Sequence, residues 1–389
     1  MNYSETRNLI AALDIGTSRI IVLVGEIKPD GILKVIGVGT NKSSGVKNSM
    51  VVDIDAAAHA IQCALVEAEL MANCKIREVY GGISGSHIRS SNSIGMIKLA
   101  GNEVSQADID RVLETASSFG LPGDQSFLHI LEQEFTIDGQ EGIKKPLGMK
   151  GMRLEVAAHI VTGAVAETHN INECAQRCGM EVNEMILQSL ASGKAVLTDD
   201  EKNFGVCLLD IGSGTTKAEI FVNGSIRYTA VLQFGADLIT ADIAMALHTT
   251  IMDAEKLKVK YGCAMRQLVE DTAIDMPATA EYGERVISRQ ILAGIIESRV
   301  RELYSIVRKE LRRQYCDDLT KFSVVVTGGG SVMPGMVELG ENVFRMPVRL
   351  GVPCHVCGLH EVAGNPGFST VVGLLLYGMD RVSQNSLVE

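Results

Sequence analysis

The sequence predicts an α/β protein with two similar domains, because one pattern of residues occurs once in each half of the chain. In this pattern an apolar run ends at a single aspartate, a turn rich in Gly, Ser and Thr follows, and a second apolar run completes a β-hairpin. It spans residues 10–22 and again residues 206–220. The two aspartates, Asp14 and Asp210, are 210 − 14 = 196 residues apart, about half of the 389 residues. This duplication indicates two domains that face each other across one ligand.

The turns of both hairpins have the composition of a phosphate site. Glycine lets backbone N–H groups approach phosphate oxygens, hydroxyl side chains add donors, and an aspartate can hold a hydrated divalent cation. One such hairpin is weak support, but two predict that the shared ligand is a nucleotide. The turn residues are Gly16, Thr17 and Ser18 in the first hairpin and Gly212, Ser213, Gly214, Thr215 and Thr216 in the second.

Composition excludes several classes of protein. A hydrophobic content of 46% and a charged content of 21% are those of a folded globular chain. The net charge of −11 argues against nucleic acid as the main partner. No apolar run approaches the roughly 18 residues of a membrane span, and residues 1–8 lack the apolar core of a signal peptide. The nine cysteines are irregularly spaced, so we expect reduced thiols in a cytoplasmic protein rather than a zinc site.

The first half of the chain predicts one domain with an insertion. A strand is expected at 32–40, a helix capped by Asp53 runs to about Met71, and a strand at 79–83 leads into a glycine-rich loop. Between 84 and 161 short strand patterns (93–99, 128–137 and 154–160) flank a helix whose cap begins at Ser105. This small α+β insertion carries no catalytic constellation, so we expect it to contact other proteins.

The second half repeats the plan with longer helices. Helices are expected at 165–178, within 185–197, at 238–248, 253–261, 285–313 and 370–378, and a polar loop at 271–283. A buried strand at 322–327 precedes Gly328, Gly329 and Gly330, which suit a backbone that approaches a flat ligand such as adenine. The basic end of the 285–313 helix either complements the helix dipole or, with Arg299 and Arg301, receives an acidic partner segment.

The order of these parts resembles the actin/Hsp70/sugar-kinase superfamily over nearly the whole chain. Within it, the sequence most resembles the FtsA family of bacterial cell-division proteins, on the motifs at 12–18, 209–212, 240–244, 254–258 and 369–375. The resemblance implies an actin-like two-domain ATPase fold with duplicated ribonuclease-H-like domains. It divides the chain into subdomains 1A (1–83, 162–198 and 359–389), 1C (the insertion, 84–161), 2A (199–229 and 304–358) and 2B (230–303).

The resemblance implies an ATP-binding protein that polymerises and tethers FtsZ filaments to the inner face of the cytoplasmic membrane, where it recruits later proteins of the division septum. The implied cofactors are ATP or ADP and Mg²⁺, held through water by Asp14 and Asp210. The implied nucleotide contacts are the turn residues above together with Gly235, Glu255, Lys258, Gly328, Gly329, Gly330 and Met333. The implied partners are the FtsZ tail on 230–303, FtsN and other division proteins on 84–161, and further copies of the chain.

The sequence departs from its relatives at three places. Ala236 follows Gly235 where relatives often have a second glycine. Gln188 stands where hydrolytic relatives often carry a glutamate, so we expect at most slow ATP hydrolysis, because an amide cannot take a proton as a base. No amphipathic membrane-binding helix follows Arg381, so we expect the lipid contact to come from a segment absent from this chain. The alternatives are a pilus-assembly adaptor of the PilM type and a small-molecule kinase, for which we find no substrate base. A chaperone of the Hsp70 type would need a further substrate domain.

Overall fold

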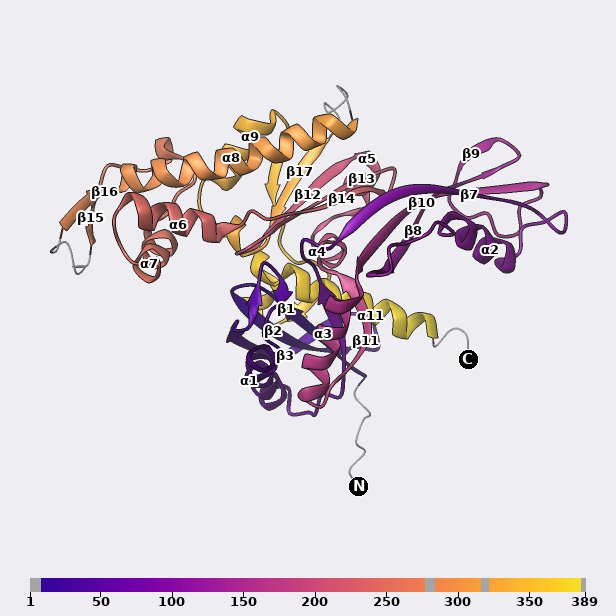
Figure 1. Cartoon of the computed structure of the whole chain (residues 1–389), viewed down its shortest axis with the longest axis horizontal. Helices are drawn as coiled ribbons and strands as arrows, with labels where there is room; N and C mark the ends of the chain where they lie inside the picture. The colour runs from indigo at the N-terminus through magenta and orange to yellow at the C-terminus, as the bar shows by residue number, and fades with distance from the viewer. Residues whose placement is uncertain (1–7, 277–282, 284, 316–321, 386–389) are drawn as a thin grey trace.

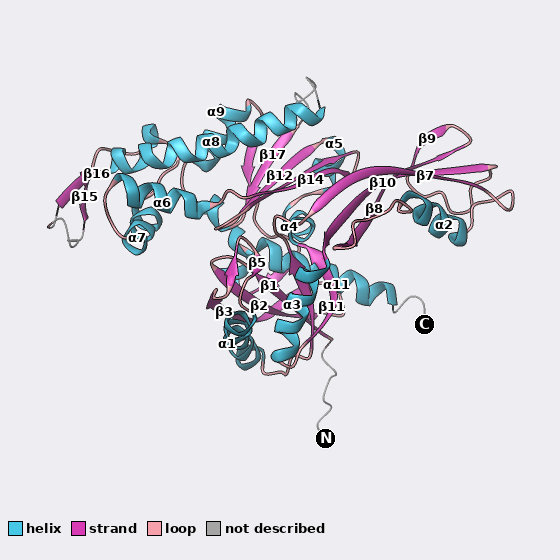
Figure 2. Ribbon diagram, in the orientation of Figure 1, coloured by secondary structure: helices cyan, strands magenta, loops and turns pink. Residues whose placement is uncertain are grey.

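The computed structural model describes residues 8–276, 283, 285–315 and 322–385; the polar segment 1–7 lies outside this range. Two mixed β-sheets lie one above the other, with helix α4 (Gln188–Val196) between them (Figures 1 and 2). The expected insertion extends to one side and a helical arm to the other. The α/β class and the two-domain plan predicted from the duplicated hairpins are confirmed.

The first domain is built on a six-stranded sheet in the order β11-β6-β1-β2-β3-β19. Its strands are β1 (Leu9–Ile15), β2 (Arg19–Ile27), β3 (Leu33–Lys42), β6 (Glu78–Ile83), β11 (Glu181–Leu187) and β19 (Val356–Gly358). Helices α1 (Ile54–Ala72) and α3 (Val165–Arg177) cover one face, and α4 and α11 (Ser369–Asn385) cover the other. Successive side chains of a strand point to opposite faces of the sheet, which explains this arrangement. Leu13 belongs to the hydrophobic core beneath α1 and α3, and its neighbour Ala12 belongs to the core beneath α4 and α11.

The second domain repeats this arrangement with five strands in the order β14-β13-β12-β17-β18. They are β12 (Val206–Ile211), β13 (Thr216–Val222), β14 (Ser225–Leu232), β17 (Ser323–Thr327) and β18 (Val348–Leu350). Its helices are α5 (Asp199–Phe204), α6 (Ala236–Ala246), α7 (Ile251–Tyr261), α8 (Arg289–Tyr315) and α9 (Met336–Phe344). Leu208 packs toward α4 while its neighbour Leu209 packs toward α6 and α8, so the sheet is buried on both faces.

Two expectations for the arm of the second domain are wrong in detail. The segment expected as a loop contains β15 (Ala273–Met276), which pairs with β16 (Arg285–Ser288); residues 277–282 lie outside the described part. Helix α8 therefore begins at Arg289, because the four residues before it form a strand. Strand β19, within the range assigned to 2A, pairs with β3 of the first domain.

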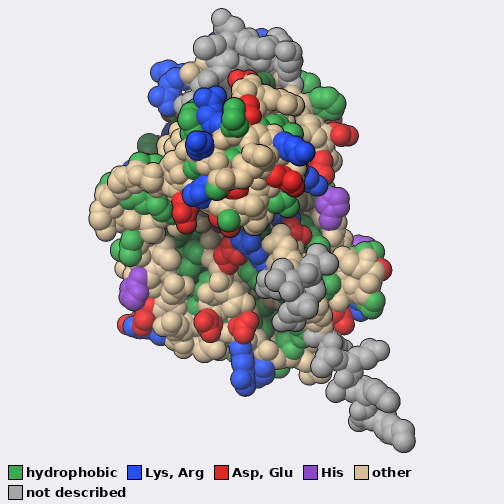
Figure 3. Space-filling model, turned by 90° about the vertical axis from the view of Figure 1, so that its right-hand side faces the viewer, with side chains coloured by type: hydrophobic (Ala, Val, Ile, Leu, Met, Phe, Trp, Pro, Cys, Tyr) green, Lys and Arg blue, Asp and Glu red, His purple; other side chains and the backbone are tan. Residues whose placement is uncertain are grey.

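The insertion is a four-stranded sheet in the order β7-β10-β8-β9, covered on one face by α2. Its elements are β7 (Arg89–Lys98), α2 (Gln106–Ala116), β8 (Gln125–Ile137), β9 (Gln140–Ile143) and β10 (Arg153–Ala164). The expected Ser105 cap is confirmed as a capping box with Asp108. On the face seen in Figure 3 acidic and basic side chains are interspersed rather than separated.

The insertion packs against β14, an edge strand of the second sheet. Asn92 Nδ2 donates to the carbonyl of Arg227 at 3.0 Å, and Ser90 Oγ donates to the carbonyl of Thr229 at 2.9 Å. Buried His159 connects the two parts, with Nδ1 2.8 Å from Asn92 Oδ1 and Nε2 3.1 Å from Thr229 Oγ1. Burial lowers the pKa of His159 to about 4, so the ring is neutral at pH 7.

Helices α4 and α11 cross between the two domains, and their backbones approach each other closely at Gly373. A Cβ atom on Gly373 would lie 1.8 Å from the carbonyl oxygen of Ala191, so only glycine allows this approach. The close crossing places residues of both helices beside the two hairpins. The remaining short elements are β4 (Val46–Lys47), β5 (Met50–Val51), α10 (His360–Ala363) and 3₁₀ turns at Arg266–Leu268, Gly329–Val332 and Pro366–Phe368.

Candidate nucleotide site

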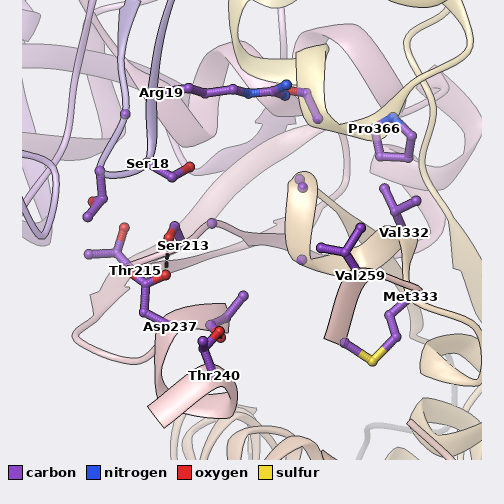
Figure 4. Close-up of a pocket in the computed structure, with 18 of the residues that line it drawn as sticks. Ser18, Arg19, Ser213, Thr215, Asp237, Thr240, Val259, Val332, Met333 and Pro366 are labelled. Atoms are coloured by element: carbon purple, nitrogen blue, oxygen red, sulfur yellow. Dashed lines mark hydrogen bonds between the residues drawn. The ribbon is translucent and has the colours of Figure 1, made fainter. Parts of the chain in front are cut away.

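A cleft of about 1040 Å³ separates the two domains, and both predicted hairpins open into it. Figure 4 shows Ser18 of the first turn near Ser213 and Thr215 of the second, while Val259, Val332 and Met333 lie together at the opposite end. Among the predicted residues, those that line the cleft are Asp14, Gly16, Thr17, Ser18, Gln188, Asp210, Gly212, Ser213, Thr215, Glu255, Lys258, Gly328, Gly329, Gly330 and Met333.

The first hairpin places a buried carboxylate at the cleft. Strand β1 carries Asp14, and the turn closes with the Gly16 amide donating to the carbonyl of Arg19 at 3.1 Å. A Cβ on Gly16 would lie 2.7 Å from that oxygen, so the turn requires glycine. Burial raises the pKa of Asp14 to about 6; Lys217 lowers it and Asp210 raises it to a lesser extent.

The second hairpin repeats this geometry, with the Gly212 amide donating to the carbonyl of Thr215 at 2.9 Å. Here the carboxylate of Asp210 is held by hydroxyls of both crossing helices. Ser192 of α4 donates to Oδ2 at 2.7 Å, and Thr370 of α11 donates to the same oxygen at 3.1 Å. Lys217, paired with Asp210 across the hairpin, brings its Nζ to 3.6 Å of Oδ2. Ser213 also donates to Asp237 at the start of α6 (Figure 4).

Gln188 reaches the first carboxylate from the beginning of α4. Its Nε2 donates to Asp14 Oδ1 at 2.7 Å, which fixes the orientation of the amide. The other amide atom, Oε1, is buried, and within the described residues no donor reaches it. A buried acceptor of this kind at a cleft fits a water molecule or a ligand atom.

The far end of the cleft combines an apolar surface with an ion pair. The side chains of Val259, Val332 and Met333 line the cleft at this end (Figure 4). Lys258 Nζ lies 2.7 Å from Glu255 Oε2, and Thr240 donates to the same oxygen at 2.5 Å. Gly328 has a φ of 85°, and a Cβ there would lie 2.3 Å from Asp210 Oδ1. An apolar surface suits a flat base, and the charged pair suits the hydroxyls of a sugar.

Five of the predicted residues lie elsewhere. Gly214, Thr216 and Gly235 do not line the cleft. The Thr216 hydroxyl donates to the carbonyl of Phe234. Gly235 packs against the turn at Ser213, because a Cβ on Gly235 would lie 2.1 Å from the Ser213 carbonyl oxygen. Arg299 and Arg301 lie on α8, away from the cleft. Arg299 forms a bidentate pair with Asp242 at 2.5 and 2.7 Å, and Arg301 pairs with Glu297 at 2.7 Å.

Sequence reasoning missed a number of residues that line the cleft, and Arg19, Ser49, Lys217, Val259, Val332 and Thr370 are among them. The sequence did contain an indication that Lys217 belongs to the site. It follows the second turn directly, and a hairpin with this turn pairs it with Asp210 on the opposite strand. Arg19 donates to the carbonyl of Gly367 at 2.6 Å across 348 positions of sequence, a pairing that no local pattern could indicate.

The two aspartates fit a hydrated cation bound with a phosphate ligand. A nearby cation would favour the ionised form of Asp14, which burial disfavours. Within the described residues no group of three or more His, Cys, Asp or Glu side chains is placed to hold a metal ion. Mg²⁺ commonly uses one or two carboxylates, water and phosphate oxygens, which matches this set. The described cleft residues include no histidine or cysteine.

Comparison with known families gives two matches. The model of cell division protein FtsA matches residues 207–373, and the model of the SHS2 domain inserted in FtsA matches residues 85–162. The chain is 48% identical to cell division protein FtsA of Pseudomonas aeruginosa over 380 residues, covering 97% of this chain and 91% of that protein. It is 38% identical to cell division protein FtsA of Escherichia coli K12, covering 96% and 91%.

Solved structures share the fold at much lower identity. A type IV pilus biogenesis complex of PilM and PilN gives a TM-score of 0.69 at 15% identity, covering 95% of this chain and 98% of that chain. MreB 5 of Spiroplasma citri bound to AMPPNP gives 0.59 at 12% identity, covering 98% of each. These likenesses confirm the actin-like fold. No helix among the described residues is long and apolar enough to span a bilayer.

Proposed function

This chain belongs to the FtsA family of bacterial cell-division proteins, and on that premise we propose that it binds ATP, polymerises and tethers FtsZ filaments to the inner face of the cytoplasmic membrane. In this role it recruits later proteins of the division septum. The observation that carries the nucleotide part is the pair of matching hairpins, which bring Asp14 and Asp210 to one cleft.

In this proposal the two turns bind the phosphates and the far end binds adenosine. The amides and hydroxyls of Thr17, Ser18 and Thr215 contact phosphate oxygens, and Lys217 adds a positive charge. Asp14 and Asp210 hold Mg²⁺ through water. Val259, Val332 and Met333 border the base, and Glu255 with Lys258 contacts the ribose. The cation supplies neutralisation of phosphate charge when it is bound.

We expect ATP hydrolysis to be slow at most. Gln188 is the proposed positioning residue for water, because no donor in the described part of the chain reaches its Oε1, while its Nε2 donates to Asp14. An amide can orient water but cannot remove its proton. Gln188→Glu would therefore raise single-turnover hydrolysis if a base is what the site lacks, and unchanged hydrolysis with intact binding would count against this role.

The proposed FtsZ contact is the surface of 230–303, with Arg299 and Arg301 as cations for an acidic tail. Both arginines already have carboxylate partners, so a tail carboxylate would have to exchange with Glu297 or Glu302. Arg301→Glu should weaken binding of an FtsZ-tail peptide in fluorescence anisotropy, whereas Arg111→Glu on the insertion should not. Equal affinity of both variants would remove Arg301 from the interface. The insertion, 84–161, is proposed for FtsN and other division proteins.

Filament formation is best tested by electron microscopy of the purified protein on a lipid monolayer with ATP and Mg²⁺. A lipid that binds an affinity tag on the protein holds it at the monolayer. Nucleotide-dependent filaments that recruit FtsZ would support the proposal; a lipid-bound protein that never assembles would contradict it.

A pilus-assembly adaptor is the second candidate, favoured by the structural likeness to PilM. A PilN-type peptide bound in place of the FtsZ tail would decide for it. The identity of 48% to an FtsA protein over nearly the whole chain favours the division role. A small-molecule kinase would be indicated only by phosphorylation of a substrate panel.

A further inference from the structure

The short hairpin of β4 and β5 has an unusual tip. Its two turn residues, Asn48 and Ser49, have φ values of 50° and 62°, both in the left-handed region. Two consecutive residues of this kind form the primed turn that joins two strands most tightly. Asparagine tolerates this conformation, but serine has no such preference, so glycine would be the easier choice at position 49. A serine at a strained position suggests that its hydroxyl has a use.

That hydroxyl lies between the two phosphate turns. The Ser49 amide donates to Thr17 Oγ1 at 2.9 Å, and Ser49 Oγ lies 3.2 Å from Thr215 Oγ1. Ser49 is 7% exposed and lines the cleft. Asn48 is equally close, since its Oδ1 would lie 2.9 Å from a Cβ on Gly214. The tip therefore contacts the first domain's turn and the second domain's turn at once.

The hairpin is fixed to the first domain at its base. The Val51 amide donates to Glu167 Oε1 of α3 at 2.7 Å. The amides of Val52 and Asp53 both donate to the carbonyl of Gly45, and Asp53 caps α1. The tip is thus carried by two helices of the first domain, while Thr215 belongs to the second. A rigid base is what a positioning contact needs.

We propose that the tip at Asn48–Ser49 contacts the terminal phosphate of a nucleoside triphosphate and makes the cleft distinguish triphosphate from diphosphate. This rests on the proposed ATP binding. The tip lies at the end of the cleft marked by Thr17 and Thr215, opposite the apolar surface of Val259 and Met333, so it meets the outermost phosphate. A phosphate oxygen accepts a stronger hydrogen bond than a neutral threonine hydroxyl. It can therefore replace Thr215 as the partner of Ser49 Oγ.

The test compares Ser49→Gly with Ser44→Gly, an exposed serine ahead of the same hairpin. Glycine adopts the left-handed conformation freely, so Ser49→Gly removes the hydroxyl and leaves the turn intact. Calorimetry on the full chain with Mg²⁺ gives Kd for ADP and for AMPPNP. We expect Ser49→Gly to weaken AMPPNP about tenfold or more and ADP by less than about twofold, with Ser44→Gly unchanged for both.

Different results would overturn the role of the tip and the proposed ATP binding. Equal weakening of both nucleotides, or no weakening of either by a variant whose melting temperature matches the wild type, overturns the role of the tip and leaves ATP binding in place. A wild-type chain that binds neither nucleotide overturns the proposed ATP binding, and the inference with it. A second variant, Asn48→Gly, preserves the turn and Ser49, so the discrimination between AMPPNP and ADP should persist in it at least in part. Its complete loss there would mean that Asn48 rather than Ser49 makes the contact.

Discussion

Glu219 should make the stability of the protein depend on pH. This residue of β13 is fully buried, and its carboxylate lies against α4. Its Oε2 lies 3.5 Å from the position of a Cβ on Gly193. Burial raises the pKa of Glu219 from 4.5 to about 8, and the nearby Ser189 hydroxyl only partly offsets this. At pH 7 the carboxyl is therefore protonated in the folded chain and ionised in the unfolded chain.

The direction in which pH changes the free energy of unfolding follows from the number of protons that each state binds. Between about pH 4.5 and 8 the folded state holds one more proton at this site, so the free energy of unfolding falls as the pH rises. The slope for one proton is about 1.4 kcal/mol per pH unit, which gives about 3 kcal/mol between pH 5 and pH 7. Glu219→Gln keeps the shape without the titration. We expect its stability relative to the wild type to rise by an amount of this order over that range.

Urea unfolding followed by circular dichroism at several pH values measures the difference. Other titrating groups, Asp14 among them, are present in both proteins and cancel in the comparison. Glu141→Gln, at an exposed position, is the matched control and should run parallel to the wild type. Parallel curves for Glu219→Gln as well would refute the reasoning, because they would mean that Glu219 carries the same charge in both states.

Four further predictions follow from the geometry. Asp210→Ala should abolish binding of Mg²⁺ and ATP without unfolding the chain, and unchanged affinity by calorimetry would remove Asp210 from the site. Mg²⁺-dependent nucleotide affinity should fall as the pH drops through about 6, where Asp14 takes up its proton, and Asp14→Asn should lose this dependence in titrations at two pH values. Gly373→Ala should destabilise the fold by about 3 kcal/mol or more in urea, because its Cβ would meet the Ala191 oxygen; Gly364→Ala, whose Cβ would be 3.7 Å from the nearest atom, is the control. Ser105→Ala should cost about 1 kcal/mol through loss of the α2 cap, and a cost near zero would show that the capping box contributes nothing.

Local signals in the sequence predicted the parts that form locally. The two hairpins close on their own turns, and the caps at Asp53 and Ser105 use side chains three residues from the amides that they accept from. These elements could therefore be predicted from residues that are close together in the sequence. The strands β15 and β16 were not predicted, because each has only four residues and they pair only with each other. Strand β19 joins β3 across more than 300 residues, which no local pattern encodes.

The candidate site divides in the same way. Asp14, Asp210 and their turns were predicted because their spacing repeats. Ser192 and Thr370 reach Asp210 only because α4 and α11 cross closely, and this crossing is a property of the folded chain. Ser49 reaches the cleft through a hairpin of two-residue strands, too short for a periodic pattern. Contacts that join distant segments remain outside the reach of sequence patterns.

The docking of the insertion on β14 decides how its role can be studied. Three carbonyls of β14, those of Ile226, Arg227 and Thr229, accept hydrogen bonds from side chains of the insertion. Deleting the insertion would leave these three carbonyls unpaired on an edge strand, to which a strand of another molecule could pair. A protein that lacks the insertion would then be prone to aggregate. A loss of function in the cell would reflect this aggregation rather than the loss of a binding partner. Surface substitutions on the far side of the insertion are the cleaner way to ask what it binds.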